Sequence, residues 1–343
     1  MQVAVLKAPG RLELEARPRP EPDPEEVLVA IGEVGICGSD LHYFEHGRIG
    51  DFVVDEPLIL GHESAGEVTE VGAAVSDVDV GTRVALEPGV PCRRCAHCRR
   101  GEYNLCPDVT FMATPPDDGA FAEYVAWPAD FAHPLPESVS VREGALCEPL
   151  SVGVHAVRRG EVGVGDSVLV TGAGPIGLLA MAAARAAGAA EVFVSDVTAA
   201  KRERARERGA DAAIDPTGAD LADAVADRTG GAGADVVIEA AGARSAISGS
   251  LDAVRWGGTV VFVGLADEAE VPLDVLDIVD KELDVRGSFR YRNAYPAAIE
   301  LLADGVVDVA GIVDFEAELA EIEPAFRRAM DDETVKGMVS VGQ

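Results

Sequence analysis

The sequence is poor in basic residues, and in lysine above all. Sixty acidic residues face 29 basic ones, which gives a net charge of −31, and the lysines are Lys7, Lys201, Lys281 and Lys336. A chain with this charge repels nucleic acid and anionic membranes, so neither is expected as a partner. The repulsion within the folded chain is screened at about 1 M salt, where the Debye length is roughly 3 Å. We therefore predict a salt-adapted host, with ordinary acidic solubility as the alternative.

The sequence also lacks a long hydrophobic run. Residues 176–190 form its longest apolar stretch, which is shorter than the roughly 20 residues of a membrane-spanning helix and is interrupted by Arg185. The opening residues, MQVAVLKAPG, have neither the basic region nor the hydrophobic core of a signal peptide. These features predict a cytoplasmic protein, and a length of 343 residues predicts two domains.

The pattern of apolar residues changes near residue 152. Before it, short apolar strands such as 27–31, 66–71 and 82–86 alternate with proline and glycine, which predicts an irregular β-barrel-like domain. After it, strands and helices alternate as far as residue 286, which predicts a parallel sheet covered by helices and an α/β fold class. The remaining residues, with a helix near 294–304, are too few for a third domain and are expected to return to the first.

The chain has few cysteines, but four of its six lie close together. They are Cys92, Cys95, Cys98 and Cys106. Zinc prefers four tetrahedral thiolates in a structural site, and the surrounding loop is too poor in apolar residues to fold around a core of its own. The alternative is a pair of disulfides, which a reducing compartment disfavours. The spacing therefore predicts a structural zinc lobe at about residues 88–108, with no position left for a substrate.

A second group of metal-binding residue types is scattered along the chain. Cys37 comes first, His62 and Glu63 follow in the segment Gly-His-Glu, and Cys147 and Glu148 come much later. A catalytic zinc ion needs about three protein ligands and an open position. Because these residues are far apart in sequence, spacing alone leaves two alternatives open, a loop histidine and a buried free cysteine.

A glycine-rich loop follows the apolar segment SVLVT and opens an alanine-rich helix. This is G-x-G-x-x-G between a strand and a helix, where the glycines let a pyrophosphate approach the helix N-terminus. The next strand ends at Asp196, whose carboxylate can accept both ribose hydroxyls and repel a 2′-phosphate, so NAD is favoured over NADP. Lys201 is a candidate to contact the same ribose, and the alternative is a solvated lysine on a helix face. The loop residues are Gly172, Gly174, Pro175, Ile176 and Gly177.

Together these segments resemble the zinc-dependent medium-chain dehydrogenases, and within them the sorbitol, or polyol, dehydrogenases. The likeness covers nearly the whole chain and is most specific in CGSDLHYFEHGRIGDFVVDEPLILGHESAGEV at residues 37–68. It extends to ATPPDDGAFAEY at 113–124, CEPLSVGVHA at 147–156 and GSFRYRNAYPAAI at 287–299. The resemblance implies a GroES-like catalytic domain at 1–151 and 287–343 and a Rossmann NAD-binding domain at 152–286.

The resemblance also implies a role for the scattered group. It makes Cys37, His62 and Glu63 the ligands of a catalytic zinc ion, in addition to the structural one. It places Glu148 near that metal, as a residue bound through water or as an exchangeable ligand. Cys147 is its neighbour, and in an extended segment neighbouring side chains point to opposite sides. We therefore expect Cys147 to be structural.

Further roles come from the resemblance alone. Ser39 and His42 match a proton relay, although a turn serine and a surface histidine are the alternatives. Side chains that match those holding a polyol are Tyr43, Glu148, Arg290 and Tyr291, with Phe111 as a wall of the cleft; an ion pair between Arg290 and Glu148 would keep the glutamate ionised. The alternatives are tyrosines of the core, a surface ion pair and a packing role for Phe111. Segments that match those contacting the nicotinamide are Val263, Gly264 and Leu265, and Ser288, Phe289 and Arg290, with a buried strand and its following turn as the alternative.

The expected reaction is NAD-dependent transfer of a hydride from a secondary hydroxyl of a polyol, such as sorbitol or xylitol, giving a ketose. The alternatives are the same chemistry on another sugar, a sugar acid or threonine, and a catalytically silent nucleotide-binding relative. The resemblance further implies a homodimer or homotetramer, with the strand near residues 283–286 as the edge that joins the sheets.

Overall fold

The computed structural model describes residues 1–266 and 270–342, which divide into two compact units. One unit holds Met1–Glu148 and Tyr295–Gln343, and the other holds Pro149–Ala294. The chain returns to the first unit at Tyr295, whose hydroxyl donates to the carbonyl of Leu86 at 2.8 Å and whose ring stacks on His133. These divisions lie a few residues from the boundaries expected after residue 151 and before residue 287.

The first unit contains most of the strands. In chain order its elements are β1 Gln2–Ala8, β2 Arg11–Ala16, β3 Glu26–Gly35, α1 Gly38–His46, β4 Arg48–Ile49, β5 Phe52–Val53, β6 Leu58–Ile59, β7 Glu63–Val71, β8 Arg83–Leu86, β9 Gly89–Val90, α2 Ala96–Arg99, η1 Tyr103–Leu105, β10 Thr110–Phe111, β11 Tyr124–Pro128, η2 Ala129–Phe131, β12 Ala132–Pro134, α3 Val141–Ala145, α10 Tyr295–Ala303, η3 Ala310–Ile312, β19 Val313–Glu318, η4 Leu319–Glu321, α11 Ile322–Ala329 and β20 Lys336–Ser340.

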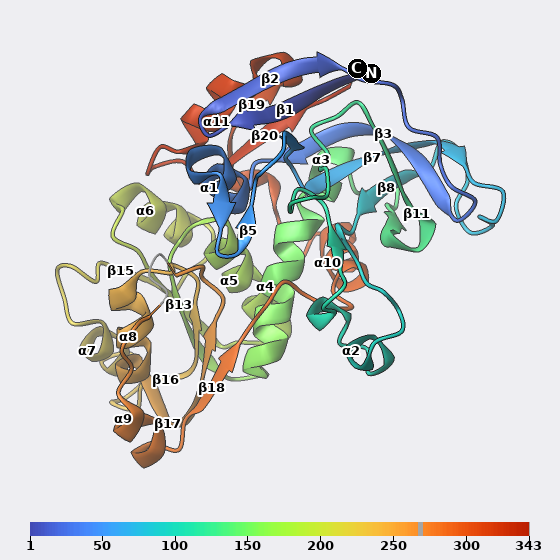
Figure 1. The fold of residues 1–343 in the computed structure, drawn as a ribbon. Coiled ribbons are helices and arrows are strands. Elements are labelled where there is room, and N and C mark those ends of the chain that lie inside the picture. The colour runs from blue at the N-terminus through green and yellow to red at the C-terminus, as the bar shows by residue number, and fades with distance from the viewer. Residues whose placement is uncertain (267–269, 343) are drawn as a thin grey trace. The chain divides into compact units, whose positions relative to one another are not determined.

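The main sheet of this unit has the strand order β12-β8-β7-β3-β20-β19, and β11 also pairs with β3. Alternating apolar residues of β3 and β7 face a core that includes Val29, Val34 and Val68, because successive side chains of a strand point to opposite faces. The C-terminal β20 pairs antiparallel with β3 (Figure 1), which brings residues near 336 beside residues near 35. The tail from Tyr295 thus belongs to the same compact unit as the first 148 residues.

The second unit alternates strands and helices. Helix α4 Cys147–Gly160 leads into it, and its remaining elements are β13 Ser167–Thr171, α5 Pro175–Ala187, β14 Glu191–Ser195, α6 Ala199–Glu207, β15 Ala212–Ile214, α7 Leu221–Ala226, β16 Ala234–Glu239, α8 Arg244–Ala253, β17 Val254–Phe262, α9 Val275–Asp280 and β18 Asp284–Gly287. In the described part of the chain its strands form one parallel sheet in the order β15-β14-β13-β16-β17-β18. This is the doubly wound dinucleotide-binding order, and the predicted α/β class is confirmed.

Residues 38–46 form helix α1, which ends at Gly47 with a φ of 68°. Another segment differs from the local structure expected from sequence. Cys147 begins helix α4, so the expectation of an extended segment at Cys147 and Glu148 is wrong. The Ser140 side chain and Glu143 form a capping box that starts the short helix α3 just before it, and this turn places Cys147 in a helix.

No helix among the described residues is both long enough and apolar enough to cross a membrane.

Candidate functional site

Cys37, His62 and Glu63 come together although 25 residues of chain separate the first two. Strand β3 ends at Gly35, which pairs with Glu63 at the start of β7, and Cys37 lies just beyond as the residue that precedes α1. One ligand atom from each of the three side chains lies within 4.8 Å of the others. A thiolate, an imidazole and a carboxylate form a donor set that fits zinc and leaves a tetrahedral position open. The pairing of β3 with β7 therefore builds the candidate catalytic metal centre.

Asp40 holds this centre in place. It is fully buried, and its carboxylate accepts hydrogen bonds from the backbone N–H of Cys37 and of Gly61, both at 3.0 Å. Its Oδ1 also lies 3.6 Å from Nδ1 of His62. A carboxylate on one ring nitrogen of a histidine leaves the other nitrogen for a metal and fixes the ring orientation. Asp40 therefore positions two of the three candidate ligands.

Lys336 of β20 forms a buried ion pair with Glu63. Its Nζ lies 2.6 Å from both carboxylate oxygens and also donates to the carbonyl of Ile36, and both side chains are 1% exposed. Burial alone would lower the pKa of Lys336, but the charge of Glu63, with smaller effects of Cys37 and Glu148, outweighs it and raises that pKa. The lysine is therefore charged, and the candidate ligand Glu63 has a fixed cation beside it.

A glycine makes room for this carboxylate. A Cβ atom at Gly35 would overlap Oε2 of Glu63, although the backbone of Gly35 is extended. A side chain at this position would displace the carboxylate from both Lys336 and the candidate metal position. Gly35 is therefore required by the close approach of a side chain and not by its own backbone conformation.

Helix α4 begins with the two residues whose roles were predicted together. Glu148 is buried, and it lies near enough to Lys336 to affect the pKa of that lysine. Cys147 is fully buried, its thiol donates to the carbonyl of Glu143, and burial raises its pKa. Cys147 is absent from the metal-binding groups found among the described residues. Its structural role stays a prediction, now with a helix in place of the extended segment.

Helix α1 carries the predicted relay and one predicted substrate residue. Ser39 and His42 are half-buried on its first two turns, and the ring of His42 lies 5.9 Å from that of His46. Tyr43 is 3% exposed and belongs to the apolar core, which is the alternative that its sequence left open. Phe111 lies beside the candidate centre, with its ring centroid 5.8 Å from that of His62. The relay and substrate roles stay predictions.

The four clustered cysteines form a second metal-binding group. One sulfur from each lies within 4.8 Å of the others, and Sγ of Cys95 and Sγ of Cys98 are 3.4 Å apart. Four sulfurs bound to zinc at about 2.3 Å lie roughly 3.8 Å from one another, so the group fits a tetrahedral zinc ion. All six cysteines are described and all are free thiols, which argues against the disulfide alternative. A backbone hydrogen bond from Arg94 lowers the pKa of Cys92 to about 7.

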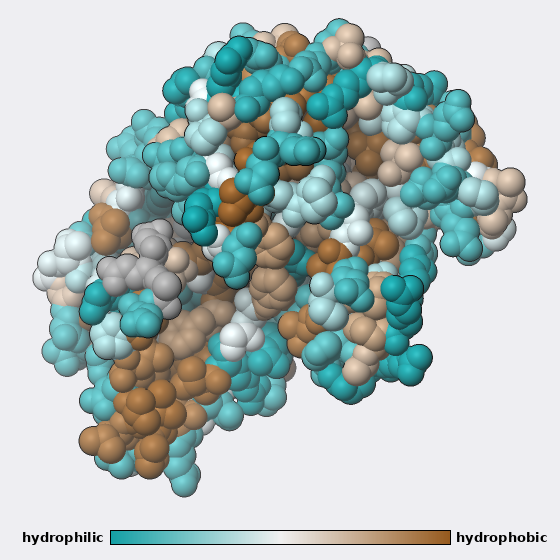
Figure 2. Space-filling view, viewed as in Figure 1, coloured by the Kyte–Doolittle hydropathy of each residue, from teal (hydrophilic) through white to brown (hydrophobic). Residues whose placement is uncertain are grey.

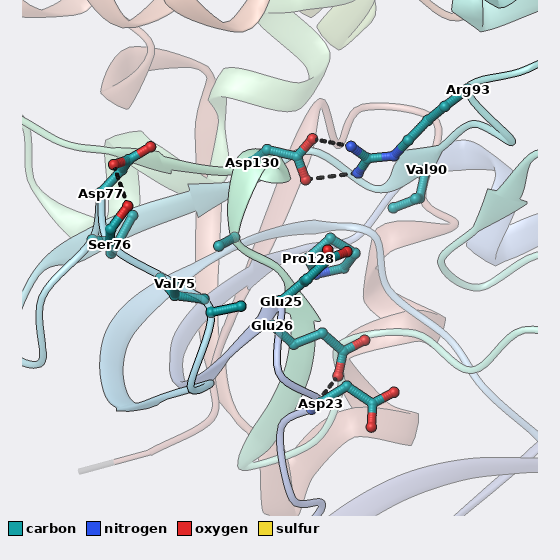
Figure 3. A pocket seen from close by; sticks show the side chains of 13 residues that line it. Asp23, Glu25, Glu26, Val75, Ser76, Asp77, Val90, Arg93, Pro128 and Asp130 are labelled. Carbon is teal, nitrogen blue, oxygen red and sulfur yellow. Dashed lines mark hydrogen bonds and ion pairs between the residues drawn. The ribbon is translucent and has the colours of Figure 1, made fainter.

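An ion pair ties this lobe to the rest of its unit. Arg93, inside the lobe, forms two parallel contacts of 2.7 Å with the carboxylate of Asp130 in η2 (Figure 3). Around them lies an acidic cavity of about 540 Å³ whose lining also includes Asp23, Glu26 and Asp77. Because the pair is exposed, it orients the lobe more than it stabilises the fold.

The glycine-rich loop joins β13 to α5 as predicted. Gly172 has a φ of 90°, and a Cβ at Gly177 would overlap the carbonyl of Gly172, so both positions require glycine. Gly174 precedes the helix, Pro175 and Ile176 begin it, and a Cβ at Gly174 would meet nothing within 4 Å. The loop is thus tightly packed on the sheet side and open on the other. This open helix N-terminus fits a dinucleotide pyrophosphate.

Asp196 follows β14 and faces the loop. Its Oδ2 accepts from the backbone N–H of Ala173 at 2.8 Å, and its Oδ1 accepts from that of Thr198 at 2.7 Å. Lys201 is half-buried on the first turn of α6. Arg202, which the sequence reading overlooked, donates to the carbonyl of Asp196 and pairs with Asp215. The carboxylate of Asp196 therefore lies beside the glycine-rich loop, and the guanidinium of Arg202 is held next to Asp196.

The remaining predicted cofactor residues follow the next parallel strands. Val263 and Gly264 donate to the carbonyl of Glu239, and Leu265 beyond them is exposed. Ser288 donates to the carbonyl of Phe262, which fixes it after β18. These residues lie at the carboxyl ends of the strands, as does the glycine-rich loop, and ligands of doubly wound sheets bind at this edge.

Arg290 and Tyr291 come just after. Arg290 has a φ of 52°, its guanidinium lies 4.8 Å from the ring of Phe289, and Tyr291 is 3% exposed. Both belong to the second unit, whereas Tyr43 and Glu148 belong to the first. Their joint role in one substrate cleft stays a prediction.

Known proteins match both units. A model described as "Alcohol dehydrogenase GroES-like domain" matches residues 23–137, and one described as "Zinc-binding dehydrogenase" matches residues 175–304. The sorbitol dehydrogenase of Bacillus subtilis (strain 168) is 45% identical over 341 residues, which are 99% of this chain and 97% of that protein. The chain belongs to the zinc-dependent medium-chain alcohol dehydrogenases. Within them it falls in the sorbitol and xylitol dehydrogenase branch, so it is an oxidoreductase with zinc and NAD as its cofactors.

Two solved structures support this membership. An oxidoreductase/dehydrogenase of unknown specificity from Escherichia coli superposes with a TM-score of 0.95 at 36% identity, and covers 100% of this chain and 99% of its own. A protein from E. coli CFT073, described as a short chain alcohol dehydrogenase complexed with NADH, superposes with a TM-score of 0.92 at 28% identity and covers 99% of each chain. The GroES-like and Rossmann folds predicted from sequence are confirmed.

Two residues of the candidate centre were assigned no role from sequence. Asp40 lies within the motif that carried the resemblance but is no metal ligand itself, so its position beside His62 becomes visible only in three dimensions. Lys336 did leave a signal, because it is one of four lysines and stands in a segment that otherwise reads as a buried strand, KGMVS. A charged residue in such a strand requires a buried partner.

Proposed function

We propose that this dehydrogenase oxidises a secondary hydroxyl of a polyol of the sorbitol or xylitol kind to a ketone, with NAD⁺ as hydride acceptor. The observation that carries this proposal is the convergence of Cys37, His62 and Glu63 in a chain so similar to a sorbitol dehydrogenase. A zinc ion bound by these three residues would act as the Lewis acid that stabilises negative charge on the substrate oxygen.

The side chains of this chain have distinct tasks in the proposal. Asp40 and Lys336 hold His62 and Glu63 in their binding orientations. Ser39 accepts the proton of the hydroxyl, and His42 passes it to solvent. Glu148 is buried at the start of α4. It lies near the three zinc ligands and forms a hydrogen bond with a water molecule or with the substrate.

The substrate chain and the cofactor engage further groups. Tyr43, Arg290 and Tyr291 supply polar atoms for the additional hydroxyls of a polyol. The loop from Gly172 to Gly177 binds the pyrophosphate, and Asp196 accepts from the adenosine ribose. Val263 to Leu265 and Ser288 to Arg290 line the nicotinamide half.

The proposal is tested by following NADH absorbance with the zinc-loaded enzyme. Sorbitol, xylitol and ribitol are compared with glucose, a sugar acid and threonine at equal concentration, in about 2 M KCl. We expect the highest kcat/KM with a polyol, and loss of turnover for all substrates in H62A. Turnover of threonine or the sugar acid without turnover of polyols would overturn the substrate class. Absence of all turnover in a protein that still binds zinc and NAD would favour the silent relative.

We also propose that the protein is a cytoplasmic homo-oligomer from a salt-adapted host. Four clustered thiols suit a reducing compartment. The last strand of the parallel sheet, β18, has one unpaired edge among the described strands, and apolar side chains are exposed near it. The net charge of −31 supports salt adaptation.

A further inference from the structure

The second unit contains a cavity lined by positive charge, which is unexpected in so acidic a chain. Its volume is about 360 Å³, and its wall includes four arginines and one histidine: Arg158, Arg159, Arg286, Arg292 and His155. Among the described residues, Glu161 supplies the one carboxylate in the wall. Arg158 and Arg159 come from the last turn of α4, Arg286 comes from β18, and Arg292 comes from the segment that follows. Three separate segments thus direct cations at one space.

Two of these arginines form no ion pair with an acidic side chain among the described residues. Arg158 donates to the carbonyl of Asn293 at 2.7 Å, and Arg159 donates to the carbonyl of Gly287 at 3.0 Å. Within the described residues neither forms an ion pair, although acidic residues outnumber basic ones two to one in the chain. A guanidinium has five N–H donors, and each of these two bonds uses one of them. The backbone therefore holds both side chains in place without neutralising them.

His155 lines the same cavity. The residue is 4% exposed, and its ring forms no hydrogen bond with another described residue. Burial, and then Arg292, Arg159 and Arg158, lower its pKa to about 4, so the ring is neutral at pH 7. A neutral imidazole has one N–H donor and one acceptor. The ring can therefore donate one hydrogen bond to a ligand in the cavity.

Arg286 is the member that is already neutralised. Its guanidinium pairs with Glu161 at 2.6 Å and donates to the carbonyl of Arg159 at 2.9 Å. This links β18 to the end of α4 and sets one wall of the cavity. The positive charge without an acidic partner among the described residues therefore comes from Arg158 and Arg159.

We propose that this cavity is a binding site for a tetrahedral oxyanion, a phosphate or sulfate group, held by Arg158 and Arg159, with His155 as a further donor and Arg292 as part of the wall. Guanidinium groups match such oxyanions because they donate parallel hydrogen bonds and carry the opposite charge. The negative charge of the ligand would also neutralise the positive charge of Arg158 and Arg159, which have no acidic partner among the described residues. The cavity wall includes no residue of the glycine-rich loop and does not include Asp196. The site is therefore separate from the predicted pyrophosphate position.

The test uses the zinc-loaded enzyme, saturated with NAD so that the nucleotide loop is occupied. Inorganic phosphate is titrated by calorimetry at constant ionic strength, set with KCl. The main variant is R158Q/R159Q, and its matched control is R327Q/R328Q, an adjacent pair in the last turn of α11. Because loss of the bonds to Asn293 and Gly287 could disturb the following segment, H155L is a second variant that leaves both arginines in place. Circular dichroism checks that each variant is folded.

We expect about one saturable phosphate per chain. Its affinity should fall about tenfold or more in R158Q/R159Q, fall several-fold in H155L, and stay unchanged in R327Q/R328Q. Sulfate should compete, whereas added chloride at the same ionic strength should not. Three results would overturn the site: no saturable binding, equal loss in both arginine pairs, or equal competition by chloride, which would indicate screening only. Activity is not the readout, so the result does not depend on the identity of the alcohol.

Discussion

At the scale of single residues, the pair of Glu63 and Lys336 shows how a candidate ligand is kept ready in the folded chain. A buried carboxylate is costly unless a cation compensates it, and Lys336 contacts both of its oxygens. A metal ion at the same centre would be a second source of positive charge for Glu63. The lysine and a metal bound there would therefore act on the same carboxylate.

The variant K336M should make folding depend on the metal. Without zinc, the change leaves Glu63 buried and unpaired, which costs about 3–5 kcal/mol. With zinc, the metal compensates part of that charge. We expect the melting temperature after chelation to fall much further than that of the zinc-loaded protein. K281M is the control, because Lys281 pairs with Asp277 at a more exposed position. An equal fall of the melting temperature with and without zinc would contradict the idea that the lysine and the metal both compensate the charge of Glu63.

A second prediction at this scale concerns Asp196. In D196N the side chain loses its charge but can still accept from Ala173 or Thr198. We expect kcat/KM with NAD to fall by about one to two powers of ten, since hydrogen bonds to charged groups are worth about 1.5–3 kcal/mol. The relative use of NADP should rise, because Arg202 remains nearby while the repelling carboxylate is gone. D215N alters the other partner of Arg202 and serves as control. An unchanged NAD to NADP ratio in D196N would rule out this role.

At the scale of elements, we expect the cysteine lobe to depend on a metal for its stability. Its short helices, α2 and η1, contain no fully buried apolar side chain, although Tyr103 of η1 packs partly buried against the core of its unit. We predict that C98S lowers the zinc content, measured by atomic emission, from about two ions per chain to about one, and lowers the melting temperature. C147A removes a buried thiol elsewhere and should keep both ions. Loss of zinc in C147A would show that this residue is a ligand.

Helix α9 and the edge strand β18 form the second element of interest. Trp256, Val275, Leu276, Val279 and Val285 are all exposed there, and apolar colour gathers over α9 and the neighbouring strands (Figure 2). Isolated exposed apolar residues are common, but a continuous patch beside an open sheet edge marks an association surface.

We expect L276E/V279E to dissociate the oligomer and lower the mass found by light scattering. V164E, at a side chain that is 93% exposed in the same unit, should leave the mass unchanged. A wild-type monomer would refute the oligomer, and an unchanged mass in L276E/V279E would move the interface elsewhere.

At the scale of the whole molecule, the net charge of −31 at pH 7 makes repulsion between acidic groups a term in the stability of the fold. Salt screens the repulsion between acidic groups, including those around the acidic cavity beside Asp130 (Figure 3). We predict that the melting temperature rises by several degrees between about 0.1 and 2 M KCl. Sucrose at equal osmolality is the control for effects that are not electrostatic. A melting temperature that is highest without salt would contradict salt adaptation.

Much of the architecture could be predicted because it depends on local patterns. The strand SVLVT, the glycine-rich loop, the alanine-rich helix and the next strand follow one another as predicted, because apolar periodicity and glycine position determine them locally. The start of helix α4 at Cys147 was not predicted, because an extended segment was expected at Cys147 and Glu148.

The sequence by itself determined the features that need only neighbouring residues: the four-cysteine lobe, the glycine-rich loop, the acidic strand end and the overall charge. Only the tertiary structure decided which distant side chains meet. The register of β3 with β7 and β20 places Cys37, His62, Glu63 and Lys336 at one point, and three separate segments bring arginines around His155. Such meetings depend on how strands pair and helices pack across the chain, which no local spacing of residues specifies.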